Sequence, residues 1–303
     1  MLIKHFASLL DEYSTKNLKN LQKLHACVIR HGVADNDFIR SKLVSSYASC
    51  SQIVQATLLF SLTIRRPTFL YNSLIRAYAS QSRFWESLFV FRCLILAGKA
   101  VDKHTLPVVL KSCSGLSNLR VGRQVHGAVL VNGFGSEVGN CNGLITMYAK
   151  CGDLPCAVKV FDEMPERNEV SWTAMMSGFG FHGKHAEVLM LFDKMVEVGM
   201  KVDGLTFTSL LMACGHVGEV ERAREYFQMM QDRFGVRQTV EHYTCMVDML
   251  GKAGLIDEAK DLVMDMKAEP DGALWRALLT ACRIHKRVDV AEWANLKMLG
   301  DAW

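Results

Sequence analysis

The stretch LITMYAKCGDLPCAVKVF, residues 144–161, matches the stretch LVSSYASCSQIVQATLLF, residues 43–60, without a gap. A shift of 101 residues superposes six identical pairs here: Leu43 and Leu144, Tyr47 and Tyr148, Ala48 and Ala149, Cys50 and Cys151, Ala56 and Ala157, and Phe60 and Phe161. The same shift pairs further residues along the chain, among them His25 and His126, Gly98 and Gly199, Thr105 and Thr206, and Cys113 and Cys214. An ungapped match of this extent indicates an array of repeated units.

Each 101-residue period divides into shorter units of two helices. Residues 169–203 contain two apolar stripes at helical spacing. The first stripe is Trp172, Met175, Met176 and Phe179, and the second is Ala186, Leu189, Phe192 and Met195. Gly183 interrupts the first stripe, and Gly199 ends the second. No alternating strand pattern of useful length occurs and only 5 prolines are present, so helices joined by short turns are expected.

A helix pair of this size has an apolar face that it cannot bury alone, whereas stacked pairs bury it between them. The sequence therefore predicts an all-α fold, an α-α solenoid of about 18 helices in antiparallel pairs with no sheet, whose inner helices line a concave groove. Periodicity leaves the hand of the solenoid open. The predicted units are 3–36, 37–67, 68–102, 103–137, 138–168, 169–203, 204–239 and 240–271, followed by a related last unit at 272–303.

Composition narrows the class of protein without naming a function. The net charge of +4 is too small to indicate a nucleic-acid partner. The 10 cysteines are scattered without a C-x-x-C and are interpreted as reduced core thiols, as at Cys113, Cys214 and Cys282. No signal-peptide segment or 18-residue uncharged span is present, so neither secretion nor a membrane span is indicated. Asp11 and Glu12 come early for an organelle transit peptide, and targeting is unreadable.

Catalytic and metal-binding patterns are missing from the sequence. His185-Ala186-Glu187 has the H-x-E form of a zinc deaminase, but no P-C-x-x-C follows it, and a repeat helix needs these residues only on its surface. No Walker loop, dinucleotide glycine fingerprint or G-x-S-x-G elbow occurs. Because His25 and His126 recur at equivalent places, they indicate packing rather than catalysis. No enzyme activity, cofactor or metal is expected.

The unit lengths alternate as long, short and standard, and this alternation resembles the triplets of the plant pentatricopeptide-repeat family. Three local phrases look like the family's short, penultimate and C-terminal extension motifs: LITMYAKCGDLPCAVKVFDEMPERNEVSW at 144–172, VEHYTCMVDMLGKAGLIDEAKDLVMDMKAEPD at 240–271, and LWRALLTACRIH at 274–285. The resemblance covers nearly all of the chain. It implies a right-handed superhelix whose last unit, 272–303, is a truncated E-type extension motif.

In this family a base is read by two side chains: the residue after the first helix's opening aromatic, and the last residue of the repeat. The resemblance places five such pairs here: Asn72 with Asp102, Asn142 with Asn168, Thr173 with Asp203, Thr208 with Thr239, and Thr244 with Asp271. Taken singly, each could instead be a helix cap. Their recurrence at fixed repeat positions favours base reading. Three repeats depart from the pattern, at Ser41 with Pro67, Pro107 with Glu137, and Arg276.

The residue three before each first reader would lie between neighbouring bases in the family's scheme. Here it is Phe69, Val170 or Leu205, and the alternative for each is a buried residue at the start of a helix. Gly139 and Glu241, at equivalent places, are not apolar wedges.

The resemblance implies a protein that binds single-stranded RNA by sequence in an organelle, the mitochondrion or alternatively the chloroplast. The triplets and extension motif resemble the subclass that specifies C-to-U editing sites. Trp303 comes before the place of the family's deaminase-like domain, so a deaminase recruited in trans is expected. The alternative is a helical scaffold that binds a protein or peptide partner. Such a scaffold would not need recurring Asn or Thr with Asp or Asn at the reading positions.

Overall fold

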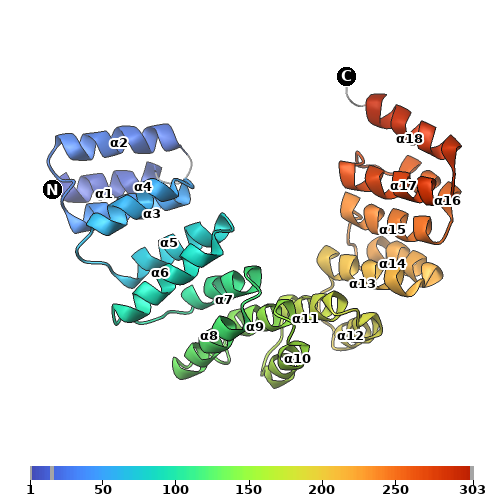
Figure 1. The fold of residues 1–303 in the computed structure, drawn as a ribbon, viewed down its shortest axis with the longest axis horizontal. Coiled ribbons are helices and arrows are strands. Elements are labelled where there is room, and N and C mark those ends of the chain that lie inside the picture. Colours follow the sequence, from blue (N-terminus) through green and yellow to red (C-terminus); the bar gives the residue numbers. More distant parts are fainter. Residues whose placement is uncertain (1, 14–16, 301–303) are drawn as a thin grey trace. The chain divides into compact units, whose positions relative to one another are not determined.

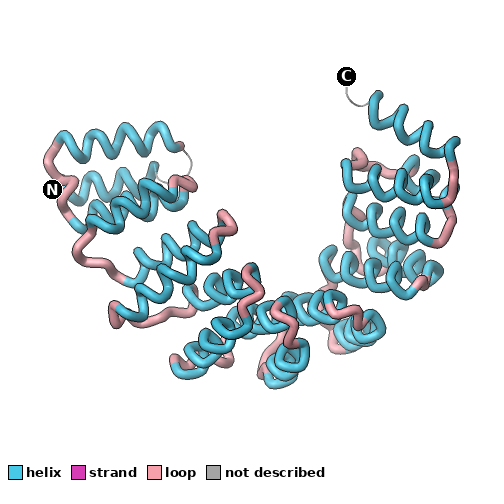
Figure 2. Tube along the Cα trace, in the orientation of Figure 1, coloured by secondary structure: helices cyan, strands magenta, loops and turns pink. Residues whose placement is uncertain are grey.

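The computed structural model describes residues 2–13 and 17–300, and these residues form eighteen helices and no strand (Figures 1 and 2). The helices are α1 (Leu2–Tyr13), α2 (Leu18–Arg30), α3 (Asp37–Ser49), α4 (Ile53–Leu62), α5 (Thr68–Ser80), α6 (Phe84–Leu96), α7 (Thr105–Gly115), α8 (Leu119–Val131), α9 (Val138–Lys150), α10 (Leu154–Glu163), α11 (Glu169–Phe181), α12 (His185–Glu197), α13 (Gly204–Val217), α14 (Val220–Asp232), α15 (Val240–Lys252), α16 (Ile256–Met264), α17 (Gly272–Ile284) and α18 (Val288–Gly300). The all-helical prediction is confirmed over the described ranges.

The chain forms two compact units, which divide between Met164 and Pro165. The first unit holds α1 to α10 and the second holds α11 to α18. Within each unit, the two helices of a pair pack together, and the first helix of each pair also packs on the first helix of the next. Odd-numbered helices therefore form one continuous layer in each unit, as expected for stacked helix pairs.

The apolar stripes of 169–203 bury six of their eight side chains, whereas Phe179 is partly buried and Ala186 is exposed. Phe192 on α12 is 3% exposed, and its ring packs against Phe207 of α13 and Tyr226 of α14, with centroid distances of 5.9 and 5.4 Å. Gly183 and Gly199 end their helices with a φ of 70°, a conformation that side-chain-bearing residues adopt at a cost. The two glycines thus fix the turns on either side of α12.

Residues that are identical under the shift of 101 also make equivalent contacts. Nδ1 of His25 lies 2.9 Å from the Tyr47 hydroxyl, and Nδ1 of His126 lies 2.8 Å from the Tyr148 hydroxyl. Each ring also packs edge-on against its tyrosine. The packing interpretation of the two histidines is therefore confirmed.

The interpretation of the cysteines as reduced core thiols fits the four that are buried, and the other six lie partly buried. Cys113, Cys141, Cys214 and Cys282 are buried, whereas the other six are partly exposed, and all ten are free thiols. No helix among the described residues is long and apolar enough to cross a membrane.

Candidate nucleic-acid interface

Asn72 and Asp102, the first predicted pair, are in direct contact. Asn72 lies on α5, Asp102 lies in the turn before α7, and Asn72 Nδ2 donates to Asp102 Oδ2 at 2.7 Å. The other carboxylate oxygen, Oδ1, accepts from the backbone N–H groups of His104 and Thr105, each at 2.9 Å. Burial raises the pKa of Asp102, but hydrogen bonds from Thr105, His104 and Asn72 outweigh it, and the pKa is lowered overall. Asp102 is therefore an ionised acceptor at neutral pH.

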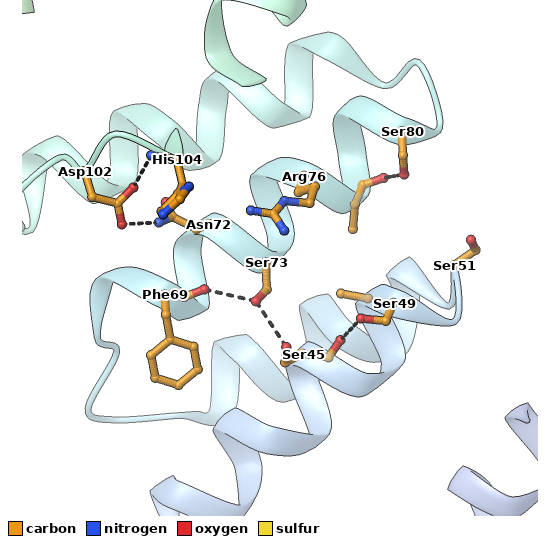
Figure 3. Close-up of a pocket in the computed structure, with 12 residues that line it drawn as sticks. Ser45, Ser49, Ser51, Phe69, Asn72, Ser73, Arg76, Ser80, Asp102 and His104 are labelled. Carbon is orange, nitrogen blue, oxygen red and sulfur yellow. Dashed lines mark hydrogen bonds between the residues drawn. The ribbon is translucent and has the colours of Figure 1, made fainter. Parts of the chain in front are cut away.

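This pair lies in an open pocket of about 680 Å³. Figure 3 shows Asn72 and Asp102 with Phe69 and Ser73 of α5, Ser45 of α3, and an arginine one helical turn further along α5. The arginine, Arg76, is exposed. The pocket thus combines an amide, a carboxylate, an aromatic face and a cation, which are the groups that bind an unstacked base and its phosphate.

Phe69 also borders a second pocket, of about 1050 Å³, whose lining includes Phe38, Ser41 and Pro67. Phe69 is 47% exposed and Phe38 is 52% exposed. An aromatic side chain between two successive pockets is the arrangement expected of a wedge between two bases. Ser41 and Pro67 lie together here, although they form no readable pair.

The three predicted wedge residues all have exposed side chains. Val170 and Leu205 are 58% and 60% exposed, so neither is a buried helix-start residue, and the same holds for Phe69. Phe38 and Arg76 are candidate contacts that the sequence reasoning missed. Phe38 stands one residue into α3, as Phe69 does on α5, and Arg76 follows Asn72 by four residues, a spacing that places both on one helix face.

In the second unit, Thr173 and Asp203 are linked through a third residue. Thr173 is 3% exposed, its hydroxyl donates to the Glu169 carbonyl at 2.8 Å, and its oxygen lies 3.3 Å from Thr206 Oγ1. Thr206 in turn donates to Asp203 Oδ1 at 2.7 Å. Asp203 itself is exposed, so the carboxylate forms the open part of this pair and the threonine forms its floor.

In two of the remaining pairs, the first reader is a threonine that bonds its own helix and the second reader is exposed. Thr208 and Thr244 donate their hydroxyls to the Gly204 and Val240 carbonyls, at 3.1 and 2.8 Å. Their partners Thr239 and Asp271 are exposed at the starts of α15 and α17. Asn142 belongs to the first unit and Asn168 to the second, so the pairing of these two asparagines stays a prediction.

The alternative that the second readers are helix caps accounts for one side-chain oxygen in three of them. Asp203 Oδ1 accepts from the backbone N–H of Thr206 at 2.9 Å, Asn168 Oδ1 from that of Ser171 at 3.1 Å, and Asp271 Oδ1 from that of Leu274 at 2.9 Å. Each carboxylate has a second oxygen. Within the described part of the chain, Oδ2 of Asp203 and of Asp271 makes no hydrogen bond. Capping therefore engages one oxygen of each carboxylate and leaves the other open.

Known proteins share both the repeats and the fold of this chain. The family model described as PPR repeat matches residues 69–98, 140–169, 205–233 and 241–269. A second family model, described as PPR repeat family, matches residues 167–216. Pentatricopeptide repeat-containing protein At1g06140, mitochondrial, of Arabidopsis thaliana is 39% identical over 277 residues, which are 91% of this chain and 50% of that protein. Pentatricopeptide repeat-containing protein CRR2, chloroplastic, of the same plant is 34% identical over 294 residues, 96% of this chain and 45% of that protein. This chain thus spans about half the length of these relatives.

The crystal structure of the pentatricopeptide repeat protein PPR10 in complex with an 18-nt psaJ RNA element superposes with a TM-score of 0.74 at 16% identity, over 91% of this chain and 42% of that one. At this identity the match shows a shared fold. Together with the repeat matches at four separate places and the similarity to plant relatives over nine-tenths of the sequence, it shows that the chain belongs to the pentatricopeptide-repeat family.

Proposed function

We propose that this chain binds single-stranded RNA by sequence, one base per helical repeat. The observation that carries the proposal is the pocket in which Asn72, Asp102, Phe69 and Arg76 come together. Repeat proteins of this kind read an unstacked base through two or three side chains. The relation to PPR10, whose structure was solved with RNA, supports the same function for this chain.

The hydrogen-bonding capacity of each pair gives a base preference. An ionised carboxylate accepts only, so Asp203 and Asp271 suit the N–H groups on the Watson–Crick edge of guanine, and the short Thr173 and Thr244 leave room for a purine. Asn72 reaches further and suits uracil, whose N3–H and carbonyls complement an amide and a carboxylate. Asn142 with Asn168 would take a pyrimidine.

The pair Thr208 with Thr239 lacks a carboxylate, but the contacts of its two hydroxyl groups show where their protons go. The Thr239 backbone N–H donates to His242 Nδ1 at 3.0 Å, so that nitrogen bears no proton, and the Thr239 hydroxyl at 2.9 Å must donate to it. Thr208 donates to the Gly204 carbonyl. Both threonine oxygens therefore act as acceptors, which suits the amino group of adenine with a weak preference.

Read from the N- to the C-terminus along RNA running 5′ to 3′, units 68–102 to 240–271 would select 5′-UNYGAG-3′, where Y is a pyrimidine and N is the unread base at Pro107 and Glu137. The test is selection of bound molecules from a randomised RNA pool by the purified chain. Enrichment of this pattern supports the proposal. Binding without base preference, or capture of peptides in place of RNA, would contradict it.

We further propose that the RNA is an organellar transcript and that binding marks a site of C-to-U editing for a deaminase acting in trans. Relatives named as mitochondrial or chloroplastic support an organelle. The long, short and standard units and the extension motif at 272–303 support the editing class by resemblance. Restored editing of one transcript in plants that lack the protein, with no editing by the purified chain alone, is the expected result. Robust editing by the chain alone would overturn recruitment in trans.

A further inference from the structure

Two threonines outside the predicted reading positions touch both members of a reading pair. Thr105 Oγ1 donates to Asn72 Oδ1 at 2.6 Å and lies 2.9 Å from Asp102 Oδ1. Thr206 Oγ1 lies 3.3 Å from Thr173 Oγ1 and donates to Asp203 Oδ1 at 2.7 Å. The two threonines are 1% and 0% exposed, and they superpose under the shift of 101 residues. The same three-residue arrangement is thus built once in each unit.

Thr105 and Thr206 each stand three residues after the second reader of a pair, at the junction between two repeat units. At two other junctions, the residue in this place is a different polar residue. Ser171, which is 0% exposed, donates its hydroxyl to Asn168 Oδ1 at 3.0 Å. His242, 2% exposed, contacts Thr239 and donates from Nε2 to the Gly204 carbonyl at 2.8 Å. After Asp271 the equivalent residue is Leu274, which offers the carboxylate only its backbone N–H. Among the five predicted reading pairs, four therefore have a buried polar side chain at this place, and the pair that ends at Asp271 lacks one.

The hydroxyl does something that the backbone N–H cannot do alone. The torsion that turns a carboxylate about its last bond is broad, so an aspartate held by backbone N–H groups at one oxygen can still rotate. A second bond to the same oxygen, from a buried side chain that is itself fixed, holds Oδ1 inward. At Asp203, which is exposed, Oδ2 is the carboxylate oxygen that then remains for a ligand. At Asp102 the hydroxyl holds Asn72 instead, and the Asn72 amide bonds Oδ2. Fixing a binding group before the ligand arrives lowers the ordering cost of binding.

We propose that Thr105 and Thr206 are positioning residues that sharpen base discrimination at their junctions. Their buried hydroxyls hold the reading side chains in one orientation: Thr105 holds Asn72, which in turn bonds Asp102, and Thr206 holds the carboxylate of Asp203. The inference rests on the proposed base-reading function and adds a third residue to it. This residue contacts no base, because it is buried beneath the pair. It acts only through the two side chains above it.

The test compares Thr206→Val, which keeps the shape and removes the hydroxyl, with Thr206→Ser, which keeps the hydroxyl. Dissociation constants are measured for four RNAs that differ only at the nucleotide facing this junction, along with thermal stability. With Thr206→Val, the preference for G over the other bases should fall about fivefold, as expected from loss of one hydrogen bond to a charged group. Thr206→Ser should keep the preference within about twofold of the unsubstituted chain.

Repeating the Thr206→Val substitution in a chain that already carries Asp203→Ala distinguishes a positioning role from general support of the fold. In Asp203→Ala, the carboxylate through which Thr206 acts is gone, so adding Thr206→Val should change the base preference by less than about twofold. If Thr206→Val weakens all four RNAs equally, or if its effect on preference persists without Asp203, the positioning inference is wrong. Base reading still stands in that case if Asp203→Ala alone alters the preferred base.

Failure of the proposed base reading would give a different result from failure of the positioning inference alone. If the unsubstituted chain shows no preference at this nucleotide and Asp203→Ala changes nothing, base reading and positioning fail together. If Thr206→Val lowers thermal stability so far that binding cannot be measured, Thr105→Val makes the same change in the other unit, where the pair is Asn72 with Asp102. There the readout is preference for U, and an unchanged preference overturns the inference.

Discussion

Arg76 follows Asn72 by one turn of α5, and both side chains line the same pocket (Figure 3). The amide offers hydrogen bonds that distinguish bases, whereas an exposed guanidinium attracts any phosphate. The two residues should therefore contribute differently to binding, one to specificity and the other to affinity.

Arg76→Ala should weaken binding to all single-stranded RNAs by a similar factor and leave the preferred base unchanged. Loss of one phosphate contact should also make the plot of log affinity against log salt less steep by about 0.7. Arg92→Ala is the matched control, because Arg92 is exposed on the second helix of the same pair, α6. An equal effect of both substitutions would show that Arg76 acts only through net charge.

Phe192→Asp should unfold part of the second unit first. The substitution places a charge among Phe207 and Tyr226, so we expect a loss of more than about 3 kcal/mol in the free energy of unfolding. Because each repeat contacts its neighbours, hydrogen exchange should accelerate in α11 to α14 before it does in the helices of the first unit. Met190→Asp is the control, since Met190 is 57% exposed on the same helix. Uniform loss of protection along the chain would count against stepwise unfolding.

Two buried thiols make stability depend on alkaline pH. Burial raises the pKa of Cys113 to about 12 and that of Cys214 to about 11, whereas an exposed thiol has a pKa near 8.5. Above pH 8.5 the unfolded chain ionises these thiols and the folded chain does not, so their contribution to stability is present below that pH and is lost as pH rises toward the folded pKa. By pH 9.5 the loss should be about 1 kcal/mol for each thiol. Urea unfolding of Cys113→Ala/Cys214→Ala should show a flatter decline between pH 8 and 9.5 than the unsubstituted chain, and equal slopes would contradict the assignment.

The helix pairs could be predicted because their signals are local. The apolar stripe before Gly183 and the second stripe before Gly199 follow from the spacing of side chains along one helix, and the two glycines supply the φ of 70° that each turn needs. The repeat shift then carried the same assignment to the other units. For Phe69, Val170 and Leu205 the repeat position left open whether the side chain is an exposed wedge or a buried helix-start residue, and the structure shows all three exposed.

The floor of the reading site could not be predicted in the same way. In sequence, Thr206 is simply the third residue after a capping aspartate, and nothing local shows that it also approaches Thr173, 33 residues earlier. That contact depends on how α11 and α13 pack. Packing also decides that Thr173 is buried while its equivalent in the first unit, Asn72, is half-buried.

The repeat geometry yields a direct test of base reading at Thr173. Asn72, Asp102 and Thr105 superpose on Thr173, Asp203 and Thr206, so the second unit already holds the aspartate and hydroxyl that accommodate asparagine in the first. Thr173→Asn should therefore reproduce the arrangement of Asn72, with the new amide donating to Asp203. The preferred base at this register should move from G to U, by roughly tenfold, because one good base contact is worth about 1–3 kcal/mol.

The other registers serve as the internal control for Thr173→Asn, because Asn72, Thr208 and Thr244 are untouched and should select the same bases as before. Selection from a randomised RNA pool measures all registers at once. The double substitution Thr173→Asn/Asp203→Ala removes the partner to which the new amide would donate, so its preference for U should be weaker than that of Thr173→Asn alone. If Thr173→Asn leaves G preferred at this register, or alters every register together, then Thr173 is not a base-reading residue and its buried hydroxyl serves only the packing of α11.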